Sequence, residues 1–265
     1  MVKHALFLGY GRMGSALGEA WLQAGLVQHI DAVDPGNIQG MQASLYPAGQ
    51  ALPATDYELV VIAVKPALAQ AALQAIPPAR LARACFISVM AGVSLRTLEP
   101  LAPAAAPVIR TMPNTPVIIG QGCTGLYANN RVNPALKNMV SALFSAVGTA
   151  CWVETEDQLH AVTAISGSGP AYYHLFSEAL AQAGMKLGLP PDIANMLAAR
   201  TALGAASLQC QQHADFAALR QAVTSPNGTT HAAIQIFEQD EQLRHLVDRA
   251  AMQAHTRSRE LDPAG

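Results

Sequence analysis

Three glycines near the start of the chain are the clearest candidate for chemistry, because their spacing suits a turn that binds the phosphates of a dinucleotide. The segment Gly9-Tyr10-Gly11-Arg12-Met13-Gly14 directly follows the apolar run Ala5 to Leu8 and opens a helical pattern. In such a turn, Gly9 permits the tight bend, Gly11 lets the backbone approach a pyrophosphate, and Gly14 lets the helix pack on the strand. The N-terminus of the helix then faces the anion. A strand before the turn and a helix after it make this a structural prediction rather than a bare pattern match.

Asp34 stands at the end of the second predicted strand, about twenty residues after the glycine turn, as dinucleotide sites require. A carboxylate in this place accepts hydrogen bonds from the adenosine ribose hydroxyls and repels a 2′-phosphate, so it favours NADH when taken alone. The turn residues Pro35 and Gly36 leave a second interpretation open, in which Asp34 caps a following helix.

Three loops follow the ends of predicted parallel strands, which is where ligands bind in open α/β sheets. Ala63-Val64-Lys65-Pro66 ends one strand and starts a helix at Pro66, and Lys65 is either a functional cation or a solvated loop charge. Ser88 to Gly92 offers small residues that permit close approach to a planar ring. Arg110 to Pro116 is a rigid loop in which Asn114 supplies both a donor and an acceptor, as part of a site or of a structural turn.

Two polar motifs lie in the second half of the chain, Ser166-Gly167-Ser168-Gly169-Pro170 and Ser225-Pro226-Asn227-Gly228-Thr229-Thr230. Each places hydroxyls and free backbone amides just before a predicted helix. The arrangement is either an ordinary helix cap or a nest that binds a carboxylate.

The elements that must position these residues change character near residue 155. Before it, short apolar runs alternate with helical patterns, which predicts a parallel sheet covered by helices. The predicted strands are Ala5–Leu8, 30–33, 59–64, 85–89 and 108–109, with added strands at 122–127 and 150–153; the predicted helices are 15–24, 67–76, 95–101 and 134–146. After it, the pattern is of long helices only. We therefore predict an α/β fold, with a dinucleotide-binding domain built on a parallel sheet over residues 1–155 and an all-helical second domain, whose helices also make the oligomer contact, over 156–265.

The charge content predicts that part of the surface is covered by another copy of the chain. Only 13% of the residues are charged although 51% are hydrophobic, against about 25% charged residues in ordinary soluble domains. Residues 158–177 contain no charged side chain at all. A helix there would have no charged face for water, so we expect a homo-oligomer with contacts made by the second domain.

Other classes of partner are disfavoured. A net charge of −2 provides no field that attracts nucleic acid. The uncharged stretch 111–130 is broken by prolines and glycines, so it does not predict a membrane span. The first residues lack a signal-peptide pattern, which makes the cytoplasm the expected location. The four cysteines are far apart and suggest neither a metal site nor a redox couple.

Together, these motifs resemble those of the Δ1-pyrroline-5-carboxylate reductases, which carry out the last step of proline synthesis. The likeness covers nearly the whole chain. The matching motifs stand in the family's order and spacing: the Gly-x-Gly-x-Met turn, 63–66, 112–116, 166–172, 225–230 and the terminal Arg257-Ser258-Arg259-Glu260-Leu261. The resemblance implies a Rossmann-type domain with a doubly wound sheet over residues 1–155, followed by an all-helical substrate-binding and dimerisation domain over 156–265. It also implies NADPH or NADH as the hydride donor and dimers that often assemble into decamers.

By this resemblance, Gly11, Arg12, Met13, Lys65, Ala91 and Gly92 line the dinucleotide site, and Gly228, Thr229 and Thr230 hold the substrate. The motifs described above add the other residues of the two sets. The expected cofactor-binding residues are Gly9, Gly11, Arg12, Met13, Gly14, Asp34, Ala63, Val64, Lys65, Pro66, Ala91, Gly92 and Asn114. The expected substrate-binding residues are Ser225, Gly228, Thr229 and Thr230, which would hold the carboxylate and the ring nitrogen. No metal site is expected.

The types of residue in the second-half motifs fit this reaction. Reduction of a ketone builds negative charge on oxygen and needs an acid such as His or Lys, which these motifs lack. Hydroxyls, amides and glycine suit a substrate that is already activated as a protonated cyclic imine. The main task is then to position the ring, and Thr230 is the expected catalytic residue because it can orient the ring nitrogen.

Two departures from the family pattern and two rival functions remain. Asn227 stands where the family usually has Gly, and Ala67 where it often has Gln; Asp34 also puts the family's usual preference for NADPH in doubt. A β-hydroxyacid dehydrogenase needs a lysine on the first long helix after the Rossmann domain, but residues 158–184 contain none. A non-catalytic dinucleotide sensor is the other alternative, and the intact pair Thr229-Thr230 argues against it.

Overall fold

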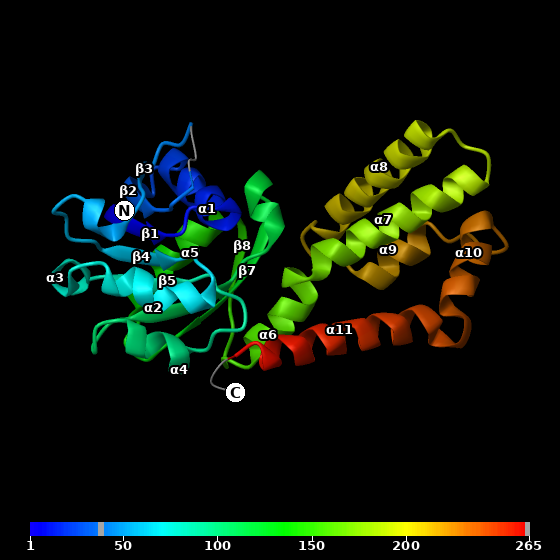
Figure 1. Ribbon diagram of the computed structural model, residues 1–265. Helices are drawn as coiled ribbons and strands as arrows, with labels where there is room; N and C mark the ends of the chain where they lie inside the picture. Colours follow the sequence, from blue (N-terminus) through cyan, green and yellow to red (C-terminus); the bar gives the residue numbers. More distant parts are fainter. Residues whose placement is uncertain (37–39, 263–265) are drawn as a thin grey trace. The chain divides into compact units, whose positions relative to one another are not determined.

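One twisted sheet forms the centre of the first part of the chain in the computed structural model, which describes residues 1–36 and 40–262 (Figure 1). Its strands lie in the order β3-β2-β1-β4-β5-β6-β7-β8. All neighbouring pairs are parallel except β6 and β7. The strand bounds are β1 Val2–Leu8, β2 Val27–Val33, β3 Ser44–Tyr46, β4 Leu59–Ile62, β5 Cys85–Ser88, β6 Val108–Met112, β7 Gly122–Ala128 and β8 Gly148–Trp152.

The strand order reverses between β1 and β4, so the chain winds outward in both directions from this point. In open α/β sheets, ligands bind at such a switch point, outside the carboxyl ends of the strands. The loops that follow β1, β4, β5 and β6 therefore meet at the edge of the sheet where a nucleotide is expected.

Helices cover both faces of the sheet (Figure 1). Buried residues of α1 (Arg12–Gln23) and α5 (Pro134–Ser145) pack into one core cluster. Buried residues of α2 (Pro66–Gln74), α3 (Pro78–Leu81) and α4 (Leu95–Leu98) pack into the cluster on the other face. Short 3-10 turns follow at η1 (Gly49–Ala51), η2 (Glu99–Leu101) and η3 (Thr115–Ile119).

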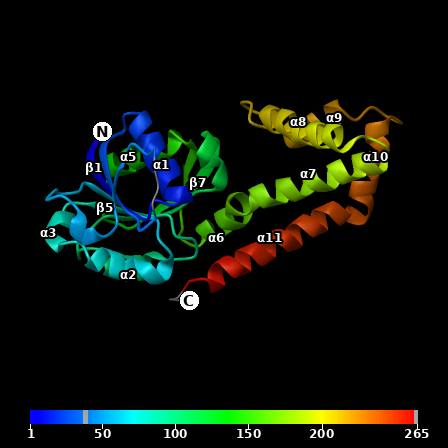
Figure 2. The ribbon, with the colours of Figure 1, turned by 45° about the horizontal axis from the view of Figure 1, so that its top comes forward.

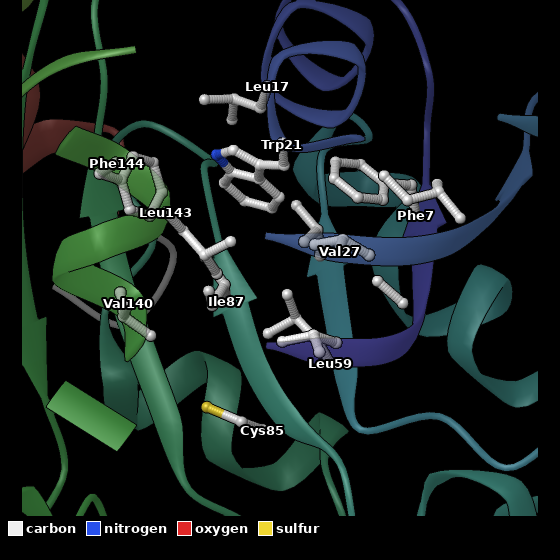
Figure 3. Packing of buried hydrophobic residues seen from close by; sticks show 14 of the residues in the cluster. Phe7, Leu17, Trp21, Val27, Leu59, Cys85, Ile87, Val140, Leu143 and Phe144 are labelled. Carbon is white, nitrogen blue, oxygen red and sulfur yellow. The ribbon is translucent and has the colours of Figure 1, made fainter. Parts of the chain in front are cut away.

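Trp21 of α1 lies at the centre of the first core cluster, with Phe7 of β1 and Phe144 of α5 on either side (Figure 3). Its ring centroid is 5.6 Å from that of each phenylalanine, tilted at 54° to Phe7 and nearly perpendicular to Phe144. The indole is fully buried, and its N–H has no hydrogen-bond partner among the described residues. Packing alone therefore holds this ring between the sheet and two helices.

Beyond β8, the described residues form helices only (Figure 2). They are α6 (Gln158–Val162), a π-helical turn η4 (Thr163–Gly167), α7 (Gly169–Lys186), α8 (Pro191–Gln209), α9 (Phe216–Ala222), α10 (Thr229–Glu238), η5 (Gln239–Glu241) and α11 (Gln242–Glu260). Gly188, at a φ of +97°, and Pro190 separate α7 from α8. None of the described helices combines the length and the hydropathy that a bilayer-spanning segment needs.

Contacts divide the chain into two units, which we describe separately. Unit 1 comprises Met1–Ser168 together with the residues from Ala254 on, and unit 2 comprises Gly169–Gln253. These ranges differ from the predicted 1–155 and 156–265. The physical reason is that α6 packs on the bare face of Gly125 in β7 through Leu159 and Val162, while the end of α11 also packs on the sheet domain.

Unit 2 exposes many large apolar side chains on the single chain. Among the most exposed are Tyr173, Leu175, Leu187, Leu203, Phe216, Ile236, Val247 and Met252. Apolar surface of this extent marks a site of protein association. The low charge content predicted an apolar surface of this kind in the second half of the chain.

The predicted α/β fold with a helical second half is confirmed, and each predicted strand and helix of the first half is present with shifted ends. The sequence reasoning missed the three-residue edge strand β3 and the single-turn helix α3. Both are too short to show a hydrophobic period.

Candidate active site

The glycine turn between β1 and α1 has the geometry of a phosphate-binding loop. Gly9 has a φ of +90°, and a Cβ there would lie 2.7 Å from the carbonyl oxygen of Ala63. A Cβ on Gly14 would collide with the carbonyl oxygen of Gly9, whereas Gly11 is exposed and faces open space. Gly9 and Gly14 are therefore required by packing, and Gly11 leaves room for a ligand.

The N-terminus of α1 is free to bind an anion. Gly11 is its N-cap, and no side chain of the described residues caps the first turn. The exposed Arg12 begins the helix and Met13 is half-buried. The unpaired backbone N–H groups and the positive end of the helix dipole thus point to the place where a pyrophosphate is expected.

Asp34 is bound to the glycine turn. Its Oδ2 accepts a hydrogen bond from the Tyr10 backbone N–H at 2.7 Å, and its Oδ1 accepts one from the Gly36 N–H at 2.8 Å. The described residues that follow contain no helix before β3, and residues 37–39 lie outside the described part of the chain, so the interpretation as a helix cap stays a prediction. Each carboxylate oxygen retains a lone pair that can accept a ribose hydroxyl.

Tyr10 and Glu19 form a support for this region that sequence reasoning missed. The buried Tyr10 hydroxyl donates to Glu19 Oε1 at 2.9 Å, and Glu19 Oε2 accepts the Gln42 N–H at 2.9 Å. Burial and the neighbouring Glu19 carboxylate raise the pKa of Tyr10, so it remains a neutral donor. Tyr10 occupies a position of the glycine motif where any residue is allowed, so the motif gives no signal for its contact with Glu19.

The loop after β4 places an unpaired cation at the same edge of the sheet. The Ala63 N–H donates to the Leu8 carbonyl oxygen at 2.8 Å, which joins this loop to the end of β1. Lys65 is the exposed N-cap of α2, and Pro66 occupies its first turn. Within the part of the chain that the structure describes, no carboxylate pairs with the Lys65 ammonium.

The loop after β5 separates two residues that were predicted to act together. Ala91 is exposed at the edge, but Gly92 is buried at a φ of +75°. A Cβ on Gly92 would lie 2.6 Å from Leu261 Cβ and 3.3 Å from the Ser258 carbonyl oxygen. Gly92 is thus required by packing against the end of α11, and a cofactor contact by its backbone stays a prediction.

Asn114 uses both ends of its amide within the protein. Its Nδ2 donates to the Ser166 carbonyl oxygen at 3.0 Å, and its Oδ1 accepts the Cys123 N–H at 2.8 Å. The side chain is buried. These bonds support the interpretation of this loop as a structural turn, and a cofactor contact by Asn114 stays a prediction.

The two polar motifs of the second half differ in the structure. In unit 1, the Ser166 hydroxyl donates back to the Val162 carbonyl oxygen at 3.2 Å. In unit 2, α10 begins at Thr229 with Gly228 as its N-cap, and none of the side chains that the structure describes caps it. Among the described residues, the hydroxyls of Ser225, Thr229 and Thr230 have no hydrogen-bond partner. The motif at residues 225–230 thus has the free donors of an anion-binding nest.

Asn227 occupies a backbone position that favours glycine, with a φ of +60°. The Gly228 N–H closes the turn on the Ser225 carbonyl oxygen at 3.0 Å. Asn tolerates this left-handed region better than other side chains. The departure from the family's Gly therefore leaves the turn intact.

His160 is a buried titratable group behind the strand edge. It is 7% exposed, and its Nδ1 lies 2.9 Å from the Ser258 hydroxyl. Burial lowers the pKa of His160 below 6.5, and the nearby Arg110 guanidinium lowers it further, against the opposing effect of Asp157. The groups that face it are Arg110 of β6, Asp157 before α6, and His255 and Arg259 of α11.

This pKa predicts a loss of stability in weak acid. Below about pH 6.5 the unfolded chain binds a proton at residue 160 that the folded protein resists, so the free energy of unfolding falls as the pH falls. Thermal unfolding at pH 7.5 and 5.5 measures the effect. We expect His160→Gln to reduce the loss of Tm between these pH values. The exposed His174 provides the control variant His174→Gln, and an equal effect of both variants would contradict the prediction.

The Rossmann-type sheet, the anion-binding turn and the loops at the strand ends define a nucleotide-binding oxidoreductase fold. Comparison with known proteins agrees: residues 5–92 match the family described as NADP oxidoreductase, coenzyme F420-dependent, and residues 156–261 match the family described as pyrroline-5-carboxylate reductase dimerisation. The chain is 42% identical to a pyrroline-5-carboxylate reductase of Pseudomonas aeruginosa over 261 residues, which cover 96% of this chain and 95% of the relative.

Solved structures give the same result over the whole chain. A pyrroline-5-carboxylate reductase of Coxiella burnetii is 32% identical with a TM-score of 0.89, covering 97% of this chain and 98% of the other. A pyrroline carboxylate reductase of Plasmodium falciparum with NADP bound is 28% identical with a TM-score of 0.85, covering 98% of both chains. This chain belongs to the pyrroline-5-carboxylate reductase family.

Proposed function

We propose that this chain reduces the cyclic imine L-1-pyrroline-5-carboxylate to L-proline, with a hydride from NADPH or NADH. The observation that carries the proposal is the likeness to curated pyrroline-5-carboxylate reductases over nearly the full length of both chains. The N-terminus of α1 in unit 1 and that of α10 in unit 2, whose first turns are capped by no described side chain, support it. One suits the cofactor's pyrophosphate and the other the substrate's carboxylate.

The residues at the sheet edge fit a dinucleotide. The open space at Gly11, the free N-terminus of α1 and the cation of Lys65 suit its phosphates, and the carboxylate of Asp34 suits its adenosine ribose. Ala63, Val64, Pro66 and Ala91 stand at the strand ends where the nicotinamide half would lie. When bound, the reduced nicotinamide supplies the hydride.

The residues at the start of α10 are proposed to hold the substrate. The free N–H groups of its first turn and the Thr229 hydroxyl bind the carboxylate, with Gly228 leaving the backbone accessible. Thr230 orients the ring nitrogen through its hydroxyl. Since the protonated imine already carries its activating charge, the protein needs only to position it, which contributes about 7 to 11 kcal/mol in well-oriented reactions.

The assembly proposed is a homodimer formed by the exposed apolar helices of unit 2, and a higher assembly such as a decamer. The match to a dimerisation family over residues 156–261 supports the dimer. The cytoplasm is the proposed location; the four thiols, all free, suit a reducing compartment.

A spectrophotometric assay tests the function. The protein is mixed with pyrroline-5-carboxylate and either NADPH or NADH, and the loss of absorbance of the reduced nicotinamide is followed together with the formation of proline. We expect turnover with the cyclic imine and none with a 2-keto or 3-hydroxy acid. Binding of the nicotinamide without its oxidation would instead support a sensor, and turnover of a hydroxy acid would support a β-hydroxyacid dehydrogenase.

Asp34 is expected to set the choice between the two nicotinamides. Because its carboxylate repels a 2′-phosphate, Asp34→Ser should raise kcat/KM for NADPH relative to that for NADH by about tenfold, equivalent to about 1.4 kcal/mol. The ratio of the two kcat/KM values is the measurement. Asp56→Ser, remote from the glycine turn in sequence, is the control, and an unchanged ratio in Asp34→Ser would show that Asp34 only supports the turn through Tyr10 and Gly36.

A further inference from the structure

The end of α11 packs against the loop that follows β5. We call Ser258–Asp262 the C-terminal turn and Val89–Ser94 the β5 loop; both belong to unit 1. The absent Cβ of Gly92 leaves just enough space for Leu261 Cβ and the Ser258 carbonyl oxygen. On α4, the helix after the β5 loop, the Thr97 hydroxyl donates to Asp262 Oδ1 at 3.5 Å. The β5 loop is therefore shaped around the C-terminal turn.

A buried hydrogen bond holds the C-terminal turn in place. Ser258 is 2% exposed and His160 is 7% exposed, and their Oγ and Nδ1 atoms are 2.9 Å apart. The ring of His255, one turn earlier on α11, packs edge-on against the ring of His160, with the two ring centroids 6.1 Å apart. Because a buried polar group that loses its partner costs about 1 to 3 kcal/mol, this bond favours one position of the turn.

The far end of the β5 loop is fixed independently. The Leu95 N–H, at the start of α4, donates to Glu156 Oε1 at 2.7 Å. The same oxygen accepts from the buried Arg110 guanidinium at 2.9 Å. At the near end, the Ser88 hydroxyl accepts the Met90 N–H at 3.2 Å. Between these two anchors, the C-terminal turn is the element in contact with Gly92.

We propose that the C-terminal turn positions the β5 loop against the bound nicotinamide, with Ser258 and His160 as positioning residues. The proposal rests on the proposed function, since Ala91 of this loop stands at the edge where the nicotinamide half would lie. It also gives a role to the terminal motif Arg257 to Leu261, which neither the cofactor nor the substrate explains. The adenosine half is bound by other loops, so displacement of the β5 loop misplaces the hydride donor without releasing the cofactor.

The test compares Ser258→Ala with Ser207→Ala, whose exposed hydroxyl, among the described residues, bonds only to the Leu203 carbonyl oxygen of its own helix. Misplacement of reacting groups by about 1 Å can cost a hundredfold in rate, and we expect Ser258→Ala to lower kcat by about tenfold. The dissociation constant of NADPH, measured by its fluorescence, should change by less than about threefold. Ser258→Thr, which retains the hydroxyl, should recover most of kcat.

Hydrogen exchange provides a readout that does not depend on activity. Ser258→Ala should speed exchange of the β5-loop amides, and Ser207→Ala should not. Should Ser258→Ala not fold, Leu261→Gly removes the Cβ that contacts Gly92 from an exposed residue and should give the same pattern. Unchanged exchange of the β5 loop, or a loss of NADPH affinity as large as the loss of kcat, would overturn the proposal. Failure of the wild-type protein to reduce the imine would overturn the proposed function, while the exchange result would still decide the contact.

Discussion

Replacing Thr230 with alanine is expected to lower kcat/KM for the cyclic imine by about ten- to a hundredfold. The hydroxyl stands in the first turn of α10 with no protein partner among the described residues, so it is free to bond the ring nitrogen. A hydrogen bond to a charged group contributes about 1.5 to 3 kcal/mol, and each 1.4 kcal/mol is a factor of ten. Steady-state kinetics with the imine as the varied substrate measures the change.

Two variants separate this role from a general effect on the helix. Thr230→Ser keeps the hydroxyl and should retain most of the activity. Thr224→Ala removes a hydroxyl that donates to the Arg220 carbonyl oxygen within its own segment, and kcat/KM should change by less than about twofold. A change of that small size in Thr230→Ala would remove Thr230 from the mechanism.

Truncation of Trp21 is expected to have the largest effect on stability. Trp21→Ala opens a cavity between Phe7 and Phe144 that the sheet and two helices cannot close, and large-to-small changes of this kind cost about 3 to 5 kcal/mol. Unfolding in denaturant, at a fixed protomer concentration because association stabilises the fold, measures the loss.

Trp21→Phe is the matched control at the same position. It keeps an aromatic ring between Phe7 and Phe144 and removes the indole N–H, which has no partner among the described residues. Removing an unpaired buried donor is favourable, and this gain offsets part of the stability lost with the smaller ring. We therefore expect Phe to cost clearly less than Ala, and equal losses for the two variants would show that ring packing does not carry the stability.

Local patterns predicted much of this fold. The strand, glycine turn and helix of residues 5–24 are one continuous signal, because each glycine has its own steric requirement. The strand ends before Lys65 and Asn114 could also be predicted, because proline bounds the apolar runs that form these strands. The family likeness then covered both units, since its long motifs at residues 166–172 and 225–230 are specific.

Contacts between distant segments could not be predicted in this way. Gly92 was expected to face a cofactor, yet its missing side chain accommodates Leu261, far along the chain. Asn114 offered a donor and an acceptor, but nothing local indicates that Ser166 and Cys123 use both. The pairing of His160 with Ser258 spans 98 positions and shows no sequence period. Such partners follow only from the three-dimensional packing.

The return of α11 to the sheet has a consequence for how the protein is made in the cell. A ribosome delivers the strands first, then all of unit 2, and only afterwards the segment from Ala254 on that completes unit 1. Domains usually fold in the order of their synthesis, but here unit 1 stays incomplete, with the place of Leu261 beside Gly92 still open, until all of unit 2 has been translated. A premature stop codon within α11 would thus leave the first domain incomplete, even though every strand has been translated.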